Sequence, residues 1–332
     1  MAYPVSDGST TGSINYTTNP TYSGTFIPSV WSAKLNAKFY AASVFGDISN
    51  TDWQGDISGM GDKVTINLAP TITVTNYTAG TALAYQVPLP NTQDLLIDKG
   101  KYFAFTVNDV LEYQAKPNLI DMFSADAAEQ MRIGIDSTVI YNTFAGGAAA
   151  NKGATAGVKS ASYNLGTDAS PITLTPALAL QKILELSSVL DEQNVPDSDR
   201  WLVIDPYTRA MLMQSNLSQA QFMGDTTSMV RNGKIGSIDR FTVYVSNQLP
   251  KGAAAAAPWF SGDGSESTIT AAGGVKRRAI IAGHKSAITF ASQITKMETV
   301  RNPNDFGDFI RSLNVFGYKV VKQEALATLV VV

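Results

Sequence analysis

The sequence lacks cysteine entirely and has one histidine, His284, among its 332 residues. Without cysteine there is no disulfide, no thiolate nucleophile and no cysteine-based metal site. One imidazole is too few for most zinc sites, and most serine or cysteine hydrolase triads need a histidine base. Only chemistry based on carboxylate, lysine or tyrosine side chains remains, so most classes of enzyme are disfavoured.

Charged residues are also scarce. Lys and Arg total 25 and Asp and Glu 28, giving a net charge of −3 and a charged fraction of 16%, well below the roughly 25% of ordinary soluble proteins. Such a surface suits a protein whose faces are buried against copies of itself, although a weakly charged globular protein remains the alternative. The absence of net positive charge argues against sequence-specific nucleic-acid binding.

Long apolar runs are missing as well. No stretch of 18 apolar residues occurs, so we expect no membrane helix. The first ten residues have neither a basic start nor an apolar run, so we expect no secretory signal peptide. At roughly 150 residues per domain, the length predicts about two domains with ample core.

In the N-terminal third, a polar segment is followed by segments whose apolar residues recur at helical or strand-like spacing. Residues 1–25 are too polar to build a core and predict an extended arm. Apolar spacing predicts a helix over 29–45, started by Pro28 and ended by Gly46. Residues 62–100 then alternate like two strands joined at 76–80. A hairpin of this length is not stable alone, so it must pack on another surface, and on a neighbouring subunit if this chain supplies none.

A long helix is predicted over 118–145, ended by Gly146 and Gly147 and long enough to be a structural spine. Its stripe of near-helical spacing consists of Ile120, Phe123, Ala127, Met131, Ile135 and Val139. We expect this stripe to share a core with Ile288, Phe290 and Ile294. Residues 146–171 are small and polar and predict a mobile loop.

The remaining elements follow from caps and alternation. Thr175 is expected to cap a helix running to about Gln193, and Asp205 to cap another ending at Gln214, with a buried strand over 201–204 between them. A strand is predicted over 241–245. Irregular stretches cover 215–237 and 251–275, and two long strand-like runs, 278–300 and 309–321, flank a turn at 302–305. An apolar tail ends the chain, and no internal repeat occurs. The fold class is α+β.

The search for chemical motifs returns weak candidates. No P-loop, G-x-S-x-G elbow, dinucleotide fingerprint or zincin motif occurs. The stretch Gly55–Gly59 resembles an elbow, but its Ser is one position late. We interpret His284 as a structural histidine, Asp191 and Glu192 as a solvated helix end rather than a glycosidase pair, and Lys276 to Arg278 as a solvated strand start rather than a nucleic-acid patch. The sequons at Asn15, Asn76 and Asn216 are interpreted as chance matches. We predict no catalytic, cofactor-binding or metal-binding residue.

The order of these elements resembles that of the major capsid protein of tailed bacteriophages. Four stretches carry the resemblance: Phe26–Ser32 entering the first helix, Trp201–Pro206, Phe241–Asn247 followed by Leu249-Pro250, and Gly283–Ile288. The resemblance covers residues 26 to 330. It implies an arm (1–25), a first helix and connection (26–61), an extended loop (62–100), a peripheral domain with the spine helix (101–150), an axial domain (151–285), and peripheral-domain long strands with a C-terminal tail (286–332).

The resemblance also implies a function. It predicts a non-enzymatic coat protein that forms hexamers and pentamers of an icosahedral shell around double-stranded DNA, located in the virion and assembled in the host cytoplasm. Its implied partners are further copies of the chain, a portal, DNA bound without sequence preference, and decoration or cement proteins. A separate scaffolding protein is expected because only about 25 polar residues precede the first predicted helix.

One covalent reaction found in some family members is not expected in this chain. Some family members are welded by Lys–Asn isopeptide bonds, but Lys63, Lys99 and Lys101 lie at the base of the predicted loop rather than at its tip. The alternatives to a shell protein are another virion component, such as a tail-tube protein, and an enzyme based on carboxylate chemistry.

Overall fold

The structure is a computed structural model that describes residues 43–53, 63–70, 72–83, 85–89, 91–109, 119–215, 236–252, 277–303 and 305–332. The chain divides into two units, Met1–Ala37 and Lys38–Val332, and every described residue belongs to the second. In the described part, no helix is long and apolar enough to cross a membrane. The predicted arm and most of the predicted helix over 29–45 lie outside the described residues.

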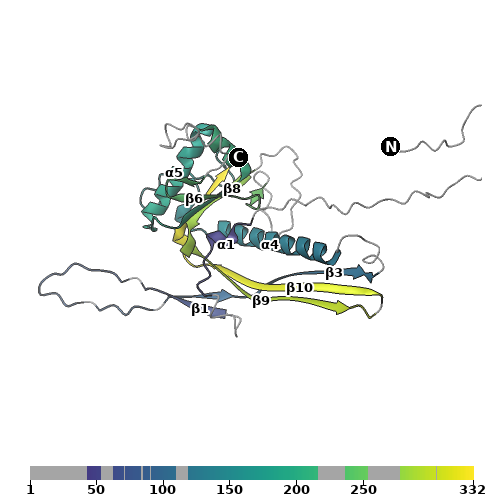
Figure 1. The fold of residues 1–332 in the computed structure, drawn as a ribbon. Helices are drawn as coiled ribbons and strands as arrows, with labels where there is room; N and C mark the ends of the chain where they lie inside the picture. Colours follow the sequence, from purple (N-terminus) through teal and green to yellow (C-terminus); the bar gives the residue numbers. More distant parts are fainter. Residues whose placement is uncertain are drawn as a thin grey trace, which may run out of the picture. The chain divides into compact units, whose positions relative to one another are not determined.

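The largest sheet has six strands in the order β11-β8-β4-β6-β5, with β7 paired to β8 (Figure 1). Only β4 and β6 run parallel; the other pairs are antiparallel. The strands are β4 (Arg200–Ile204), β5 (Ser237–Ile238), β6 (Phe241–Val245), β7 (Lys251–Gly252), β8 (Arg277–His284) and β11 (Leu326–Val331). All residues of β4 and β11 are buried, which places the main hydrophobic core around this sheet.

Two helices pack with this sheet, and both begin where the sequence predicts. Helix α5 (Pro176–Glu192) starts at Thr175, whose side chain accepts a hydrogen bond from the Leu178 N–H at 3.3 Å. Helix α6 (Pro206–Gln214) starts at Asp205, whose carboxylate accepts from the Thr208 N–H at 2.9 Å. In each case the cap is followed by a proline at the first helical position, where its missing N–H costs nothing.

A second sheet has three strands in the order β3-β10-β9. These are β3 (Lys99–Asn108), β9 (Ile288–Arg301) and β10 (Gly307–Val320). The spine helix α4 (Leu119–Ala145) packs on one face of this sheet (Figure 1), and Ile135 and Val139 form a buried cluster there with Phe290 and Phe316. The predicted contact between the helix stripe and Phe290 is confirmed, whereas Ile288 belongs to the main core and the side chain of Ile294 lies outside the described residues.

The third sheet is a hairpin of β1 (Lys63–Leu68) and β2 (Asn91–Leu96). Short helical turns complete the described structure: α1 (Phe45–Ile48), η1 (Ala149–Asn151), η3 (Lys285–Ala287) and η4 (Gln323–Ala325). Gly46 lies inside α1, so the prediction that it ends a helix is wrong.

The single long strand predicted over 278–300 is wrong, because two strands in different sheets share this run. β8 ends at His284, η3 turns the chain, and β9 begins at Ile288 in the three-stranded sheet. The His284 ring nitrogen Nδ1 accepts a hydrogen bond from the Ser286 N–H at 3.1 Å and so stabilises this turn.

Two further predictions need correction. Residues 146–171 are not a mobile loop: Asn151 is buried and donates to the Glu324 and Leu326 carbonyls, and Leu165 joins the main core. The C-terminal tail was grouped with the long strands of 286–332, yet β11 pairs with β8 in the six-stranded sheet. Its side chains are apolar except for Thr328 and all are buried, and its position in the six-stranded sheet beside α5 provides this burial.

Candidate assembly surface

The most unusual surface feature is the segment between β1 and β2, residues 69–90, which we call the extended loop. Its large apolar side chains are between 63% and 94% exposed. They are Ile72, Val74, Tyr77, Leu83, Tyr85, Val87 and Leu89. A soluble monomer rarely exposes a contiguous apolar set of this size, so the loop is a candidate interaction surface.

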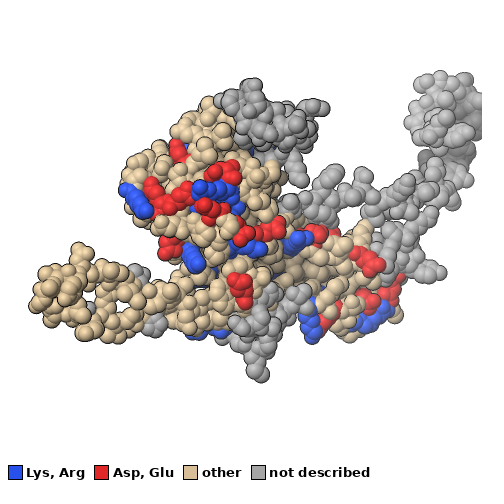
Figure 2. Space-filling model, turned by 60° about the vertical axis from the view of Figure 1, so that its left-hand side comes forward, with Lys and Arg blue, Asp and Glu red and all other residues tan. Residues whose placement is uncertain are grey.

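The extended loop carries no charge. From Val64 to Gln93 the sequence contains no Asp, Glu, Lys, Arg or His. Figure 2 shows the projecting loop without blue or red atoms, whereas both signs of charge are interspersed over the rest of the visible face. The loop can therefore be covered by a partner without any charge of the loop being buried unpaired.

The prediction of two strands running through the loop is wrong. Strand pairing is confined to its base, from Lys63 opposite Leu96 to Leu68 opposite Asn91, and the described loop residues beyond it form no strand. Prolines at 70, 88 and 90 remove backbone donors that a ladder would need. The amide group of Gln86 links the arms instead, accepting from the Thr73 N–H at 3.1 Å and donating to the Thr73 carbonyl at 2.9 Å.

The base of the loop is fixed to the rest of the fold. Ile66, Leu95 and Ile97 form a buried cluster with Ala291 of β9 and Val321. The backbone of β10 passes so close to the hairpin that a Cβ on Gly317 would lie 2.1 Å from the Leu96 carbonyl oxygen. The loop thus projects its apolar side chains from a rigid base.

The three-stranded sheet offers a second partly apolar surface. Phe103, Phe105 and Ile310 point toward α4, where they contact Ile120 and Met122. The alternate residues point to the opposite face, where Tyr102 lies across from Leu313 and Phe309 across from Val300. These four side chains are exposed. Ion pairs such as Arg311 with Glu298, 2.7 Å apart, lie between them.

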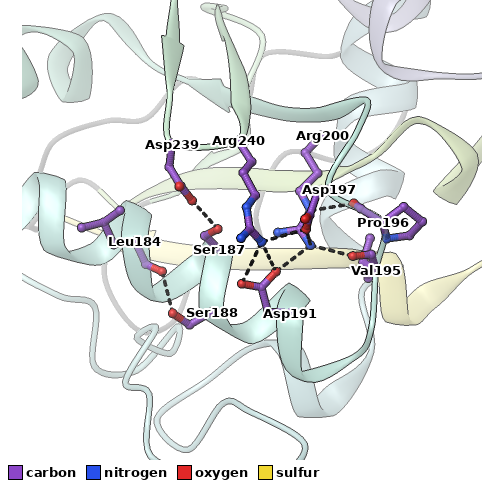
Figure 3. A network of polar contacts seen from close by, with 10 residues as sticks. All are labelled: Leu184, Ser187, Ser188, Asp191, Val195, Pro196, Asp197, Arg200, Asp239 and Arg240. Carbon is purple, nitrogen blue, oxygen red and sulfur yellow. Dashed lines mark hydrogen bonds and ion pairs between the residues drawn. The ribbon is translucent and has the colours of Figure 1, made fainter. Parts of the chain in front are cut away.

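The paired acids at the end of α5 are accessible to solvent, as expected for a helix end, and the structure adds hydrogen-bond partners that the sequence does not show. Asp191 receives hydrogen bonds from Arg200 at 2.7 Å and from Arg240 at 3.1 Å (Figure 3). The Arg200 side chain is fully buried and also donates to the Val195 and Pro196 carbonyls. Glu192 accepts from the Lys159 and Ser160 N–H groups, and a hydrogen bond from the Ser160 side chain, together with these two, lowers its pKa. Both acids tie α5 to neighbouring segments.

The basic run is likewise structural. Arg277 is buried and donates to the Asp168 carbonyl at 3.0 Å. Arg278 pairs with Asp205 at 3.1 Å, and its guanidinium lies 4.0 Å from the centre of the Tyr207 ring. The prediction of a solvated strand start is therefore wrong for these two residues; Lys276 lies outside the described part.

The remaining predicted candidates are not brought together. Burial lowers the pKa of His284, which is held at the β8–β9 turn, and the elbow-like stretch 55–59 is outside the described residues. Lys63 pairs with Asp94 at 3.0 Å and Lys99 with Asp98 at 3.0 Å. Asn76 is exposed on the extended loop, and the other two sequons are not described. Among the described residues, no group of three or more His, Asp or Glu could hold a metal ion.

The sequence-based predictions do not include one buried acidic residue that makes structural contacts. Asp136 lies on α4 next to Ile135 of the apolar stripe and is fully buried. Its Oδ1 accepts hydrogen bonds from the Val44 and Phe45 N–H groups, at 3.0 and 2.8 Å. An acid next to Ile135 and one helical turn before Val139, on the core side of a predicted helix, is the signal that could have identified it.

Comparisons with known proteins define the class. Residues 90–329 match a family model described as phage capsid protein. The chain therefore belongs to the phage capsid protein family, and the resemblance to the major capsid proteins of tailed bacteriophages is confirmed. Its mixed helix-and-sheet architecture is that of tailed-phage capsids, and it is a structural protein of the virion capsid, where subunits associate with one another. No curated protein matches the sequence.

Solved capsid structures share the fold over nearly the whole chain. A structure described as Mycobacterium phage Che8 is 25% identical, covers 92% of this chain and 97% of its own, and has a TM-score of 0.71. The capsid structure of cyanophage P-SCSP1u is 16% identical, covers 97% of both chains, and has a TM-score of 0.64. The capsid of Ralstonia phage GP4 is 11% identical, covers 95% and 97%, and has a TM-score of 0.62.

Proposed function

We propose that this chain is the shell-building subunit of a tailed phage, which assembles into hexamers and pentamers of a closed icosahedral shell around double-stranded DNA and has no enzymatic activity. The observation that carries the proposal is the charge-free extended loop, whose seven large apolar side chains are exposed while its base is fixed in the fold. Such a loop is suited to pack on an adjacent subunit, where the exposed face around Tyr102 and Leu313 offers matching apolar side chains.

The energetics favour association. Burying one large apolar side chain contributes about 1.5–3 kcal/mol, so seven would contribute roughly 10–20 kcal/mol per contact. This gross gain is of the order of the roughly 4–15 kcal/mol that association costs in lost freedom. A single contact is therefore weak to moderate. Closed symmetry repeats the same contact many times, which stabilises the shell collectively.

In the proposed domain scheme, the three-stranded sheet with α4 forms the peripheral domain (101–150 and the long strands of 286–332). The six-stranded sheet with α5 and α6 forms the axial domain (151–285), to which the last strand, β11, is added. The arm (1–25) and the connection (26–61) complete the scheme, with the hairpin and extended loop (62–100) projecting toward a neighbour.

The proposed partners are a separate scaffolding protein, a portal, decoration or cement proteins, and packaged DNA, with assembly in the host cytoplasm. DNA contact should be weak and indifferent to sequence. The net charge is −3, and Arg200, Arg240, Arg278 and Arg301 are paired with carboxylates. These paired cations contribute little to neutralising phosphates, and the chain as a whole has no excess of positive charge.

Deletion of residues 70–90 tests the proposal. The expected product is a folded, soluble subunit that no longer assembles, because the deleted residues lie outside the buried clusters while the hairpin base remains. A sharper variant, Val74→Asp with Val87→Asp, places charges on two of the most exposed loop side chains and should have the same effect. The matched control, Val74→Thr with Val87→Thr, keeps the shape and adds no charge. Normal shells from the deletion or from the charged variant would contradict the proposal.

A further inference from the structure

Residues 43–53, which we call the strap, contact three separate hydrophobic clusters. Val44 and Ile48 are buried in the main core around the six-stranded sheet. Phe45 packs on Phe290, with ring centres 5.0 Å apart, in the cluster between α4 and the long strands. Trp53 packs on the cluster at the base of the extended loop. The strap therefore couples the parts of the subunit that must hold a fixed geometry in an assembly.

The strap is attached by polar contacts at two points. At its C-terminal half, Asn50 donates from its N–H to the Ile288 carbonyl at 2.9 Å and accepts from the Phe290 N–H at 3.0 Å. The Thr289 hydroxyl also donates to the Asn50 side chain at 2.5 Å. At the N-terminal half, the Asp136 carboxyl group of α4 accepts hydrogen bonds from the Val44 and Phe45 N–H groups.

Only one of the two oxygen atoms of the Asp136 carboxyl group takes part in this contact. The stability of the contact therefore depends on whether the acid is protonated. Oδ1 accepts both hydrogen bonds, whereas Oδ2 is buried and has no hydrogen-bond partner among the residues that the structure describes. An ionised carboxylate with a bare, buried oxygen is costly, and adding a proton removes the charge while leaving Oδ1 able to accept both bonds. The closed strap thus fits the protonated acid better than the ionised one.

We propose that Asp136 is a proton-operated latch on the strap, holding it closed when protonated and allowing it to open more readily when ionised. Opening admits water to the carboxylate, which relieves the cost of the buried charge. The state of one buried acid would in this way set how firmly the main core, the spine-helix cluster and the loop base are tied together.

The groups around Asp136 are consistent with a protonated acid in the closed strap. Burial is the largest influence and raises the pKa of Asp136 to about 6, against the hydrogen bonds from Val44 and Phe45 and the charge of Arg132, which lower it. Strap residue Asp47 is exposed and acidic. β9 contributes the neutral Thr289 and Phe290. β10 contributes Tyr318, which stays neutral because burial, with the charge of Asp98, raises its pKa to about 12.

The sign of the pH dependence follows from this pKa. Because the closed-state pKa lies above the ordinary value of 3.8, the contribution of the proton is fully present at low pH and is lost as pH rises through about 6. If the open state has the ordinary pKa, linkage predicts about tenfold more opening at pH 7.5 than at pH 5.0.

Hydrogen exchange on the purified full-length chain tests the latch. Protection of peptides from the strap, corrected for the intrinsic pH dependence of exchange, should fall about tenfold from pH 5.0 to 7.5 with a midpoint near 6. Peptides from α5 provide an internal reference that should not share this midpoint. Asp136→Asn should abolish the dependence in the strap, and Glu129→Gln, on the same helix, should preserve it. Constant strap protection in the wild-type chain would overturn the proposal, whether or not Asp136→Asn folds. A tenfold change that persists in a folded Asp136→Asn variant would overturn it as well.

Discussion

Replacing a phenylalanine by alanine should lower the free energy of unfolding by different amounts in the buried part of the spine-helix core and at its exposed end. Phe316 is 1% exposed and stacks on Phe290 and Tyr318, at 5.9 and 6.4 Å between ring centres. Phe123, in the first turns of α4, is 39% exposed and meets the edge of Phe105. The sequence pattern alone treats Phe123 as a core residue.

The structure sets the expected magnitudes. Phe316→Ala should lower the free energy of unfolding by about 3–5 kcal/mol, the usual cost of removing a fully buried ring. Phe123→Ala should cost only about 1–2 kcal/mol, because burying a whole Phe side chain is worth about 1.5–3 kcal/mol and this ring is only partly covered. Since the removed atoms are identical, the difference reports burial and the cavity left behind rather than side-chain chemistry.

Thermal unfolding of the soluble, unassembled variants measures this difference. At about 1–2 °C per kcal/mol for a chain of 332 residues, Phe316→Ala should lower Tm by about 3–10 °C and Phe123→Ala by about 1–4 °C. Equal losses at the two positions, or a larger loss at Phe123, would refute the assignment of the core to the C-terminal half of α4.

Arg200→Ala should lower the free energy of unfolding by about 2–4 kcal/mol, because two carbonyl groups and Asp191 lose a buried donor; Arg311→Ala, at an exposed pair, is the near-neutral control, and equal effects would contradict the network's role. Gly317→Ala should cost at least about 1–3 kcal/mol by forcing the β10 and β2 backbones apart, whereas Gly100→Ala meets nothing closer than 3.8 Å and should be tolerated. A salt titration of the subunit against two unrelated DNA duplexes should show weak, equal binding that is lost toward physiological salt; nanomolar affinity there, or preference for one duplex, would contradict confinement of DNA by geometry alone.

Elements with local signals could be predicted from the sequence. The spine helix was expected over 118–145 and spans Leu119–Ala145, because its apolar stripe and terminal glycines lie within the segment itself. Helices α5 and α6 start at the expected caps for the same reason. The buried strand β4 and the partly buried strand β6 also lie where short apolar runs are bounded by turn residues.

Features that depend on distant partners could not be predicted. Alternation between Ile72 and Leu89 is the same in a paired strand and in an exposed arm, and prolines on both arms decide against pairing. Apolar, strand-like residues continue on both sides of His284 in the run from Arg278 to Val300. The local pattern therefore does not show that the chain changes sheets there. The contact between Asp136 and the strap joins residues about ninety positions apart, and periodicity within one helix carries no information about it.

Electron microscopy of the purified full-length chain tests the central claim most directly. The account predicts five- and six-subunit rings or closed shells that form from the wild-type chain and are absent after deletion of residues 70–90. A chain that remains monomeric at high concentration, or that forms long tubes instead of closed shells, would contradict the account.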